Sequence, residues 1–141
     1  MRTISIVALF VLTVAAAADA PVLEPKDFAA QLAKGSEVAV FQVGFGYQYR
    51  ANHIPGAVYA GPASRPDGIE LLKTAAAKLS RDREIVLYCG CCPWEKCPNI
   101  KPAIEALKGM GFTRVTAVHI PTTFKADWID KGYPVESGEK K

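Results

Sequence analysis

Apolar residues recur along the chain in two patterns, one typical of helices and one typical of buried strands. Three short segments carry apolar and β-branched residues without a two-residue period, which indicates strands covered on both faces. These segments are residues 36–43, 83–89 and 114–120, with a briefer apolar step at Ala57–Tyr59. Helical spacing of apolar residues marks residues 25–35, 69–80, 99–112 and 124–132. The sequence therefore predicts strands and helices in alternation.

This alternation indicates a three-layer α/β/α fold, in which helices cover both faces of a central parallel sheet. In such sheets, binding and catalytic sites form at the carboxyl ends of the strands. The second of the three longer predicted strands ends at Cys89. We therefore expect this residue to belong to the functional site.

The N-terminal segment differs from the rest of the chain. Arg2 precedes an apolar run from Ile4 to Val14, and small residues follow. This is the layout of a secretory signal peptide, and the run is short for a transmembrane helix. We expect a signal peptide at residues 1–18, with cleavage after Ala20 as the second candidate and an uncleaved membrane anchor as the alternative.

Export would place the mature chain in the periplasm or outside the cell, where disulfides persist. The formal net charge is +3, and no basic cluster with interleaved aromatic residues occurs, so we expect no nucleic-acid partner. We also expect no membrane contact after cleavage, no cofactor and a monomer. One domain is expected at residues 23–136, followed by a solvated tail at 137–141.

All four cysteines lie between positions 89 and 97: Cys89, Cys91, Cys92 and Cys97. A cysteine between a strand end and a helix start favours the thiolate, because loop N–H groups and the following helix stabilise an anion. A persulfide is also an anion and would be held in the same way. We therefore expect Cys89 to be the reactive thiol; the alternative is that it is a small buried apolar residue. The expected anion-binding loop consists of Gly90, Cys91, Cys92, Pro93 and Trp94.

Four motifs carry a resemblance to a known family. They are "HIPGAVY" at 53–59, "EIVLYCG" at 84–90, "AIEALKGMGFTRVTAV" at 103–118 and "ADWIDKGYPV" at 126–135. In this order they resemble a single rhodanese-like domain. The resemblance implies a small α/β fold with a parallel sheet, in which Cys89 takes sulfane sulfur from a donor as a persulfide and passes it to a thiol acceptor. Donor and acceptor would be small molecules or proteins.

The chain departs from the family's pattern in three places. The loop after Cys89 is longer than usual and contains no arginine. The usual Asp-x-Arg before "HIPGA" is replaced by "FQVGFGYQYR", and "PTT" replaces the usual Gly-Gly before the last helix. The nearby cations that could bind an anionic substrate are Lys96 and Lys101. A phosphatase of this fold needs an arginine that forks onto phosphate, so that activity is disfavoured, and persulfide donors are favoured over thiosulfate.

The three remaining cysteines leave several uses open. We expect Cys97 to be bridged to Cys92 or Cys91, with a slight preference for Cys92, so that the loop is braced and Cys89 stays free. Alternatively, Cys89 pairs with Cys91, Cys92 or Cys97 as the resolving partner in a thiol–disulfide exchange protein. Four thiolates could also bind zinc or Cu(I) in a non-catalytic or protein-binding module, although the spacing is not that of structural zinc sites.

A few other residues have expected places. His53 is expected to bond backbone groups at a turn, His119 to be structural, and Trp128 to lie in the core. Trp94 would either cover the cysteine loop or offer a docking surface.

Overall fold

The computed structural model describes residues 20–138. The expected signal peptide at residues 1–18 therefore lies outside the described residues, as do the last three residues of the expected tail. Within the described part, no helix combines the length and the apolar character that a membrane span requires.

The described residues form a parallel sheet of five strands. These are β1 (Val22–Leu23), β2 (Ala39–Gln42), β3 (Val58–Tyr59), β4 (Ile85–Tyr88) and β5 (Val115–Val118), in the order β1-β5-β4-β2-β3. All four neighbouring pairs are parallel. Strand β4 lies in the middle, and each of its residues is buried, as expected for an Ile-Val-Leu-Tyr run with apolar layers on both faces.

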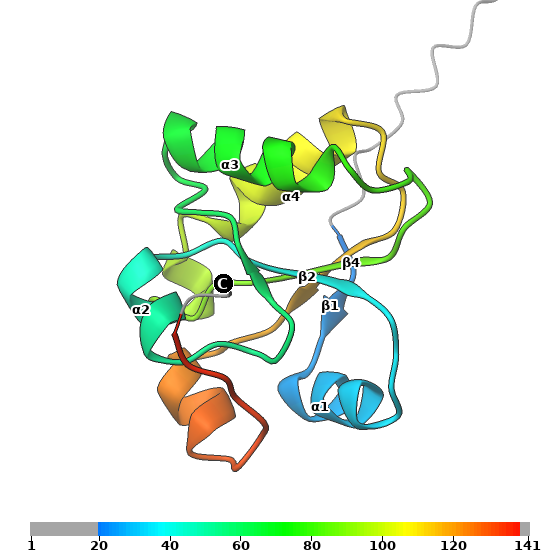
Figure 1. Cartoon of the computed structure of the whole chain (residues 1–141). Helices are drawn as coiled ribbons and strands as arrows, with labels where there is room; N and C mark the ends of the chain where they lie inside the picture. Colours follow the sequence, from blue (N-terminus) through cyan, green and yellow to red (C-terminus); the bar gives the residue numbers. More distant parts are fainter. Residues whose placement is uncertain (1–19, 139–141) are drawn as a thin grey trace, which may run out of the picture.

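Helices cover both faces of the sheet (Figure 1). They are α1 (Pro25–Ala33), α2 (Gly46–Ala51), α3 (Pro66–Ala76), the 3₁₀ turn η1 (Trp94–Lys96), α4 (Ile100–Gly109) and the π-helical turn η2 (Lys125–Ile129). The core on one face includes Leu72 of α3 and Leu107 of α4. The core on the other face includes Phe28 of α1, Tyr49 of α2 and Trp128 of η2. The expected three-layer α/β arrangement is thus confirmed.

The alternation of side chains along β4 determines toward which face of the sheet the Cys89 side chain points. Ile85 and Leu87 point into the core beneath α3 and α4, and so does Cys89 just beyond the strand. Val86 and Tyr88 point into the opposite core. Because alternate residues of a strand share a face, the Cys89 side chain is directed toward α4.

All of the longer predicted elements are present, with shorter bounds. The structure adds three elements that the sequence did not predict: β1, α2 and η1. Helix α2 has six residues, begins with Gly46 and buries only Tyr49, so it carries almost no apolar periodicity. Strand β1 is only two residues long. Trp128 lies fully buried in the core, as predicted.

Candidate active site

The segment from Cys89 to Asn99 joins β4 to α4 at the carboxyl edge of the sheet. Gly90 begins it with a φ of +73°, and a Cβ at this position would lie 2.5 Å from the Cβ of Phe124. The Gly90 carbonyl also accepts a hydrogen bond of 3.1 Å from the Phe124 N–H. Only glycine combines this left-handed backbone with so close a contact. Gly90 therefore fixes the start of the loop against the segment before η2.

A second contact holds the middle of the loop. The Trp94 N–H donates to the Pro121 carbonyl at 3.1 Å. The Trp94 ring meets His119 edge-on, with 5.1 Å between ring centroids. His119 in turn has Nδ1 at 3.0 Å from Glu24 Oε1. Trp94 is half-buried and therefore covers the loop rather than projecting into solvent.

Three of the four sulfur atoms form a cluster. The Sγ atoms of Cys89, Cys91 and Cys97 all lie within 4.8 Å of one another. Cys89 is only 2% exposed, whereas Cys91 and Cys97 are half-buried. All four cysteines are free thiols. The bridge predicted from Cys97 to Cys92 or Cys91 is therefore not formed in this structure.

Asn99 connects the sulfur cluster to the neighbouring loop. Its side chain is fully buried, and Oδ1 accepts a 2.9 Å hydrogen bond from the Ser64 N–H. Its Nδ2 lies 3.3 Å from Cys89 Sγ and 3.7 Å from Cys91 Sγ. Asn99 was predicted to open the helix, and it does occupy the position before α4, but its side chain makes no capping bond. It orients the sulfurs instead, a role that the sequence did not reveal.

The helix start beyond Asn99 stabilises a thiolate at Cys97. A hydrogen bond from the Cys89 thiol contributes most, and the backbone N–H groups of Asn99 and Ile100 add to it, so that the pKa of Cys97 is lowered to about 6. Cys91 also accepts from Cys89, and its pKa falls to about 7. The cluster therefore carries negative charge near neutral pH, and the Cys97 sulfur holds it best.

Cys89 is the proton donor of the cluster. Hydrogen bonds to Cys91 and Cys97, followed by burial, raise the pKa of its thiol, and the Cys91 N–H that points at it only partly opposes this. The prediction that the strand-end position favours a thiolate at Cys89 is therefore wrong for the reduced protein. The negative charge lies instead on the neighbouring Cys97 sulfur, because the backbone N–H groups of Asn99 and Ile100 at the start of α4 point at it.

Cys92 lies outside the three-sulfur cluster. Its thiol donates to the Lys96 carbonyl at 3.8 Å. Burial, followed by a hydrogen bond to Cys91, raises its pKa to about 12. Within residues 20–138 the sulfurs that could hold a soft metal ion are thus three rather than four, and the four-sulfur set of a structural zinc site is incomplete.

Gly44 lies against the buried sulfur from the opposite side. A Cβ at this position would be 2.9 Å from Cys89 Sγ and 3.1 Å from Gln42 Nε2. Gln42 is 2% exposed, and its Oε1 has no hydrogen-bond partner among residues 20–138. The missing side chain at Gly44, which is itself buried, leaves the room that the Cys89 sulfur occupies.

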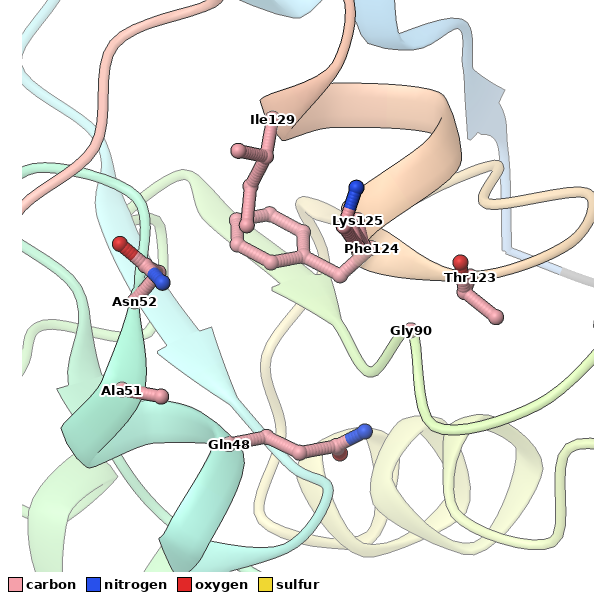
Figure 2. Close-up of a pocket in the computed structure, with 8 residues that line it drawn as sticks. All are labelled: Gln48, Ala51, Asn52, Gly90, Thr123, Phe124, Lys125 and Ile129. Carbon is pink, nitrogen blue, oxygen red and sulfur yellow. The ribbon is translucent and has the colours of Figure 1, made fainter.

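A pocket of about 470 Å³ is lined by residues of α2 and η2 and by Gly90 of the cysteine loop. Its lining residues are Gln48, Ala51, Asn52, Gly90, Thr123, Phe124, Lys125 and Ile129. Figure 2 shows Gln48 extending from α2 toward the side where Gly90 lies. The pocket meets the cysteine loop at Gly90 but does not include Cys89. A smaller space lined by Cys89, Cys92, Trp94 and Cys97 is too narrow for a water molecule.

The cations predicted to bind substrate do not line either space. Lys96 and Lys101 are both exposed, and neither is among the lining residues of the two pockets. The lysine that does line the larger pocket is Lys125, which pairs with Asp130 at 2.7 Å. Of the predicted loop, Gly90, Cys91, Cys92 and Trp94 surround the buried sulfur, whereas Pro93 is exposed.

His53 takes the predicted structural role. It is 2% exposed, and its Nδ1 is 2.8 Å from the Tyr49 carbonyl. Its backbone also pairs with Glu136 through two hydrogen bonds of 2.8 Å. His53 therefore ties the C-terminal segment to the turn before β3.

Comparison with known proteins identifies the family. The family model described as "Rhodanese-like domain" matches residues 24–120. A search of curated proteins found no match. Among solved structures, the Alr3790 protein from Anabaena sp. is 21% identical with a TM-score of 0.64, covering 84% of this chain and 94% of that one. The BH2092 protein from Bacillus halodurans is 22% identical with a TM-score of 0.65, covering 84% and 77%.

A larger protein contains the same fold. Thiosulfate sulfurtransferase from Pseudomonas aeruginosa is 19% identical with a TM-score of 0.61 over 86% of this chain, which spans only 21% of that protein. At these identities the structural matches establish the fold, and the family model covers more than half of the sequence. The chain therefore belongs to the rhodanese-like domain family.

Proposed function

We propose that the protein is a sulfurtransferase in which Cys89 carries sulfane sulfur as a persulfide. The observation that carries this proposal is the buried Cys89 thiol at the end of β4, in contact with a neighbouring thiol of lowered pKa. A nucleophile beside a group that can take its proton is the usual arrangement for covalent catalysis. The family, together with the structural similarity to a thiosulfate sulfurtransferase from Pseudomonas aeruginosa, supports the reaction class.

The chemistry would begin with proton transfer from Cys89 to the Cys97 thiolate. The Cys89 sulfur then attacks the outer sulfur of a donor persulfide, and the donor's S–S bond breaks with its electron pair leaving on the donor thiolate. Cys89 then carries the additional sulfur. An acceptor thiolate completes the cycle by attacking that outer sulfur, and Cys89 leaves as the thiolate.

Persulfides are the donors that fit the charges of this site best. Thiosulfate is a dianion and needs cationic partners. The cysteine loop contains no arginine, and Lys125 in the adjacent pocket is already paired with Asp130. A higher catalytic efficiency with glutathione persulfide or polysulfide than with thiosulfate is the expected ranking, and the reverse ranking contradicts it.

Mass spectrometry of the reduced mature protein tests the proposal. After incubation with glutathione persulfide, one additional sulfur atom is expected on the peptide that contains Cys89. Cys89→Ser should lose both the adduct and sulfur transfer, whereas Cys92→Ser, a matched change in the same loop, should retain the adduct. A full adduct and full transfer activity in Cys89→Ser would refute the assignment.

Thiol–disulfide exchange is the second candidate function, and the short distance between two of the cysteine sulfurs favours it. Cys89 and Cys97 lie within 4.8 Å, close enough for a disulfide after a small shift. A dithiol couple that equilibrates with thiol oxidants while the protein transfers no sulfur would support exchange over sulfur transfer.

We also propose that the protein is exported to the periplasm or beyond. Its sequence pattern at residues 1–18 supports this. Expression of the full chain followed by cell fractionation and N-terminal sequencing tests the proposal. A soluble exported product beginning at Asp19 or Pro21 agrees with it, and an uncleaved chain retained in the membrane or cytoplasm contradicts it.

A further inference from the structure

We propose that Cys97 resolves the Cys89 persulfide, so that the protein releases sulfide and is left with a Cys89–Cys97 disulfide that a dithiol reductant reopens. This inference rests on the proposed role of Cys89 as the sulfur carrier. It adds a second activity, persulfide reduction, and names the chemical class of the partner that each cycle requires.

The geometry brings the two sulfurs together without rearrangement of the fold. Cys89 Sγ and Cys97 Sγ lie within 4.8 Å. Cys97 follows the η1 turn and is held there by a 3.1 Å hydrogen bond from its N–H to the Trp94 carbonyl. A disulfide needs sulfurs about 2 Å apart, so local movement of the loop is sufficient.

Cys97 is also the thiol best prepared to attack. The backbone N–H groups of Asn99, just before the ten-residue helix α4, and of Ile100, its first residue, point at its sulfur. These contacts stabilise the thiolate, which is the attacking form in thiol–disulfide exchange. Cys97 is half-buried, whereas Cys89 is only 2% exposed, so a partner meets Cys97 first.

The other two cysteines are poorer candidates. A bridge from Cys91 to Cys89 would close a ring across Gly90 alone. The backbone of Gly90 is fixed by its φ of +73° and by its contacts with Phe124. Cys92 lies outside the three-sulfur cluster, and its thiol faces the Lys96 carbonyl.

The atoms and electrons of the step balance. The Cys97 thiolate attacks the inner sulfur of the protonated Cys89 persulfide, and the bond between the inner and outer sulfurs breaks. The outer sulfur leaves with its electron pair as hydrosulfide. The two cysteines are oxidised to one disulfide while the sulfane sulfur is reduced to sulfide. A dithiol reductant then returns both cysteines to thiols and becomes a disulfide itself.

A single-turnover experiment on the mature protein tests the step. The reduced protein is loaded with polysulfide, freed of excess donor, and kept without any external thiol. One equivalent of sulfide per loaded protein is expected, together with a disulfide-linked peptide pair that contains Cys89 and Cys97. Repeated turnover is expected only after addition of dithiothreitol. Sulfur that stays on Cys89, sulfur that leaves as elemental sulfur with all four thiols intact, or a bridge mapped to another pair would overturn the inference.

Substitutions separate this inference from the proposed function on which it rests. Cys97→Ser, loaded at alkaline pH and scored only on its loaded fraction, should release sulfide at least about tenfold more slowly. Gly109→Ala, in α4 at a position where the added Cβ meets no described atom within 4 Å, is the control and should retain sulfide release. Loss of loading in Cys89→Ser tests the proposed function alone. If Cys97→Ser loads and releases sulfide at the unaltered rate, the resolving role is wrong while the sulfurtransferase proposal stands.

Discussion

Asn99 holds the sulfur cluster and the neighbouring loop with one side chain. Its Oδ1 accepts from the Ser64 N–H, and its Nδ2 donates to the sulfurs of Cys89 and Cys91. The amide thus stabilises negative charge on sulfur without adding a charge of its own. The side chain is fully buried, so each of these bonds is protected from water.

Asn99→Asp should slow sulfur loading at neutral pH by about tenfold or more, because a carboxylate repels thiolate and persulfide anions. The substitution keeps the acceptor for the Ser64 N–H, so the fold should persist. Loading rates measured across pH should recover as pH rises, since the substitution raises the pKa of the thiols. Slow loading at every pH, with an unfolded circular dichroism spectrum, would instead indicate a structural role only.

Gly44→Ala should block sulfur loading of Cys89 by crowding its sulfur. The added Cβ would lie 2.9 Å from Cys89 Sγ, closer than van der Waals contact permits. Gly109→Ala in α4 is the matched control, since nothing lies within 4 Å of that Cβ. Persulfide formation is measured by mass spectrometry. Equal loading of the two variants would show that the space at Gly44 does not limit persulfide formation at Cys89.

Alkylation of Cys97 should follow its lowered pKa. Because only the thiolate reacts, the rate with iodoacetamide should rise through pH 6 and level off above about pH 7. Cys92, with a pKa of about 12, should react slowly over the same range and serves as the internal control. Peptide mapping after timed quenching measures both rates. A Cys97 profile that still climbs at pH 9 would contradict the thiolate assignment.

At the scale of elements, the contacts that hold the middle of the loop between β4 and α4 include one aromatic contact and two backbone bonds. The Trp94 ring packs on His119, and the backbone bonds join Gly90 to Phe124 and Trp94 to Pro121. Such a segment opens locally at a lower free energy than the sheet does. Access to Cys89 is therefore controlled by the loop rather than by the fold.

Trp94→Ala should speed alkylation of Cys89 by about tenfold, equivalent to ~1.4 kcal/mol of opening free energy. The backbone bond of residue 94 remains, so the midpoint of thermal unfolding should change little. Tyr47→Ala, at a side chain 65% exposed on α2, is the control and should leave the alkylation rate unaltered. An unaltered rate in Trp94→Ala would show that the ring does not shield the sulfur.

The long elements could be predicted from the sequence, because their apolar patterns are set by burial alone. The Ile-Val-Leu-Tyr run of β4 and the helical spacing of α4 are examples. The position of Cys89 at the strand end could be predicted for the same reason. The distribution of charge among the cysteines could not, because it depends on how the irregular loop brings Cys97 back to Cys89. The role of Asn99 could not be predicted either, because its side chain bonds to Ser64 and to the cysteine sulfurs instead of capping α4.

At the scale of the whole molecule, the two apolar cores meet at the central sheet, and α4 links one core to the site. Leu107 of α4 is fully buried, while Leu71 of α3 is 49% exposed. The apolar core that contains Leu107 therefore stabilises both the fold and the start of α4, whose N–H groups point at Cys97.

Leu107→Ala should lower the free energy of unfolding by about 2–5 kcal/mol, since it removes buried apolar contacts and leaves a cavity. Leu71→Ala, the same change on the exposed side of α3, should cost less than about 1 kcal/mol. Urea denaturation followed by circular dichroism measures both. Equal losses in the two variants would contradict the placement of Leu107 in the core.

The central position of β4 determines how fast the backbone amides in each part of the site exchange with solvent. Its amides are bonded between β2 and β5, so they exchange with solvent hydrogen only when the sheet opens as a whole. The loop that begins at Gly90 lies outside this ladder and exchanges through local fluctuation. Cys89 thus lies at the boundary between the slowly exchanging amides of β4 and the rapidly exchanging amides of the loop. In the proposed cycle, Cys89 would carry sulfur next to the slowly exchanging strand, and a reductant would reach Cys97 in the rapidly exchanging loop without unfolding of the sheet.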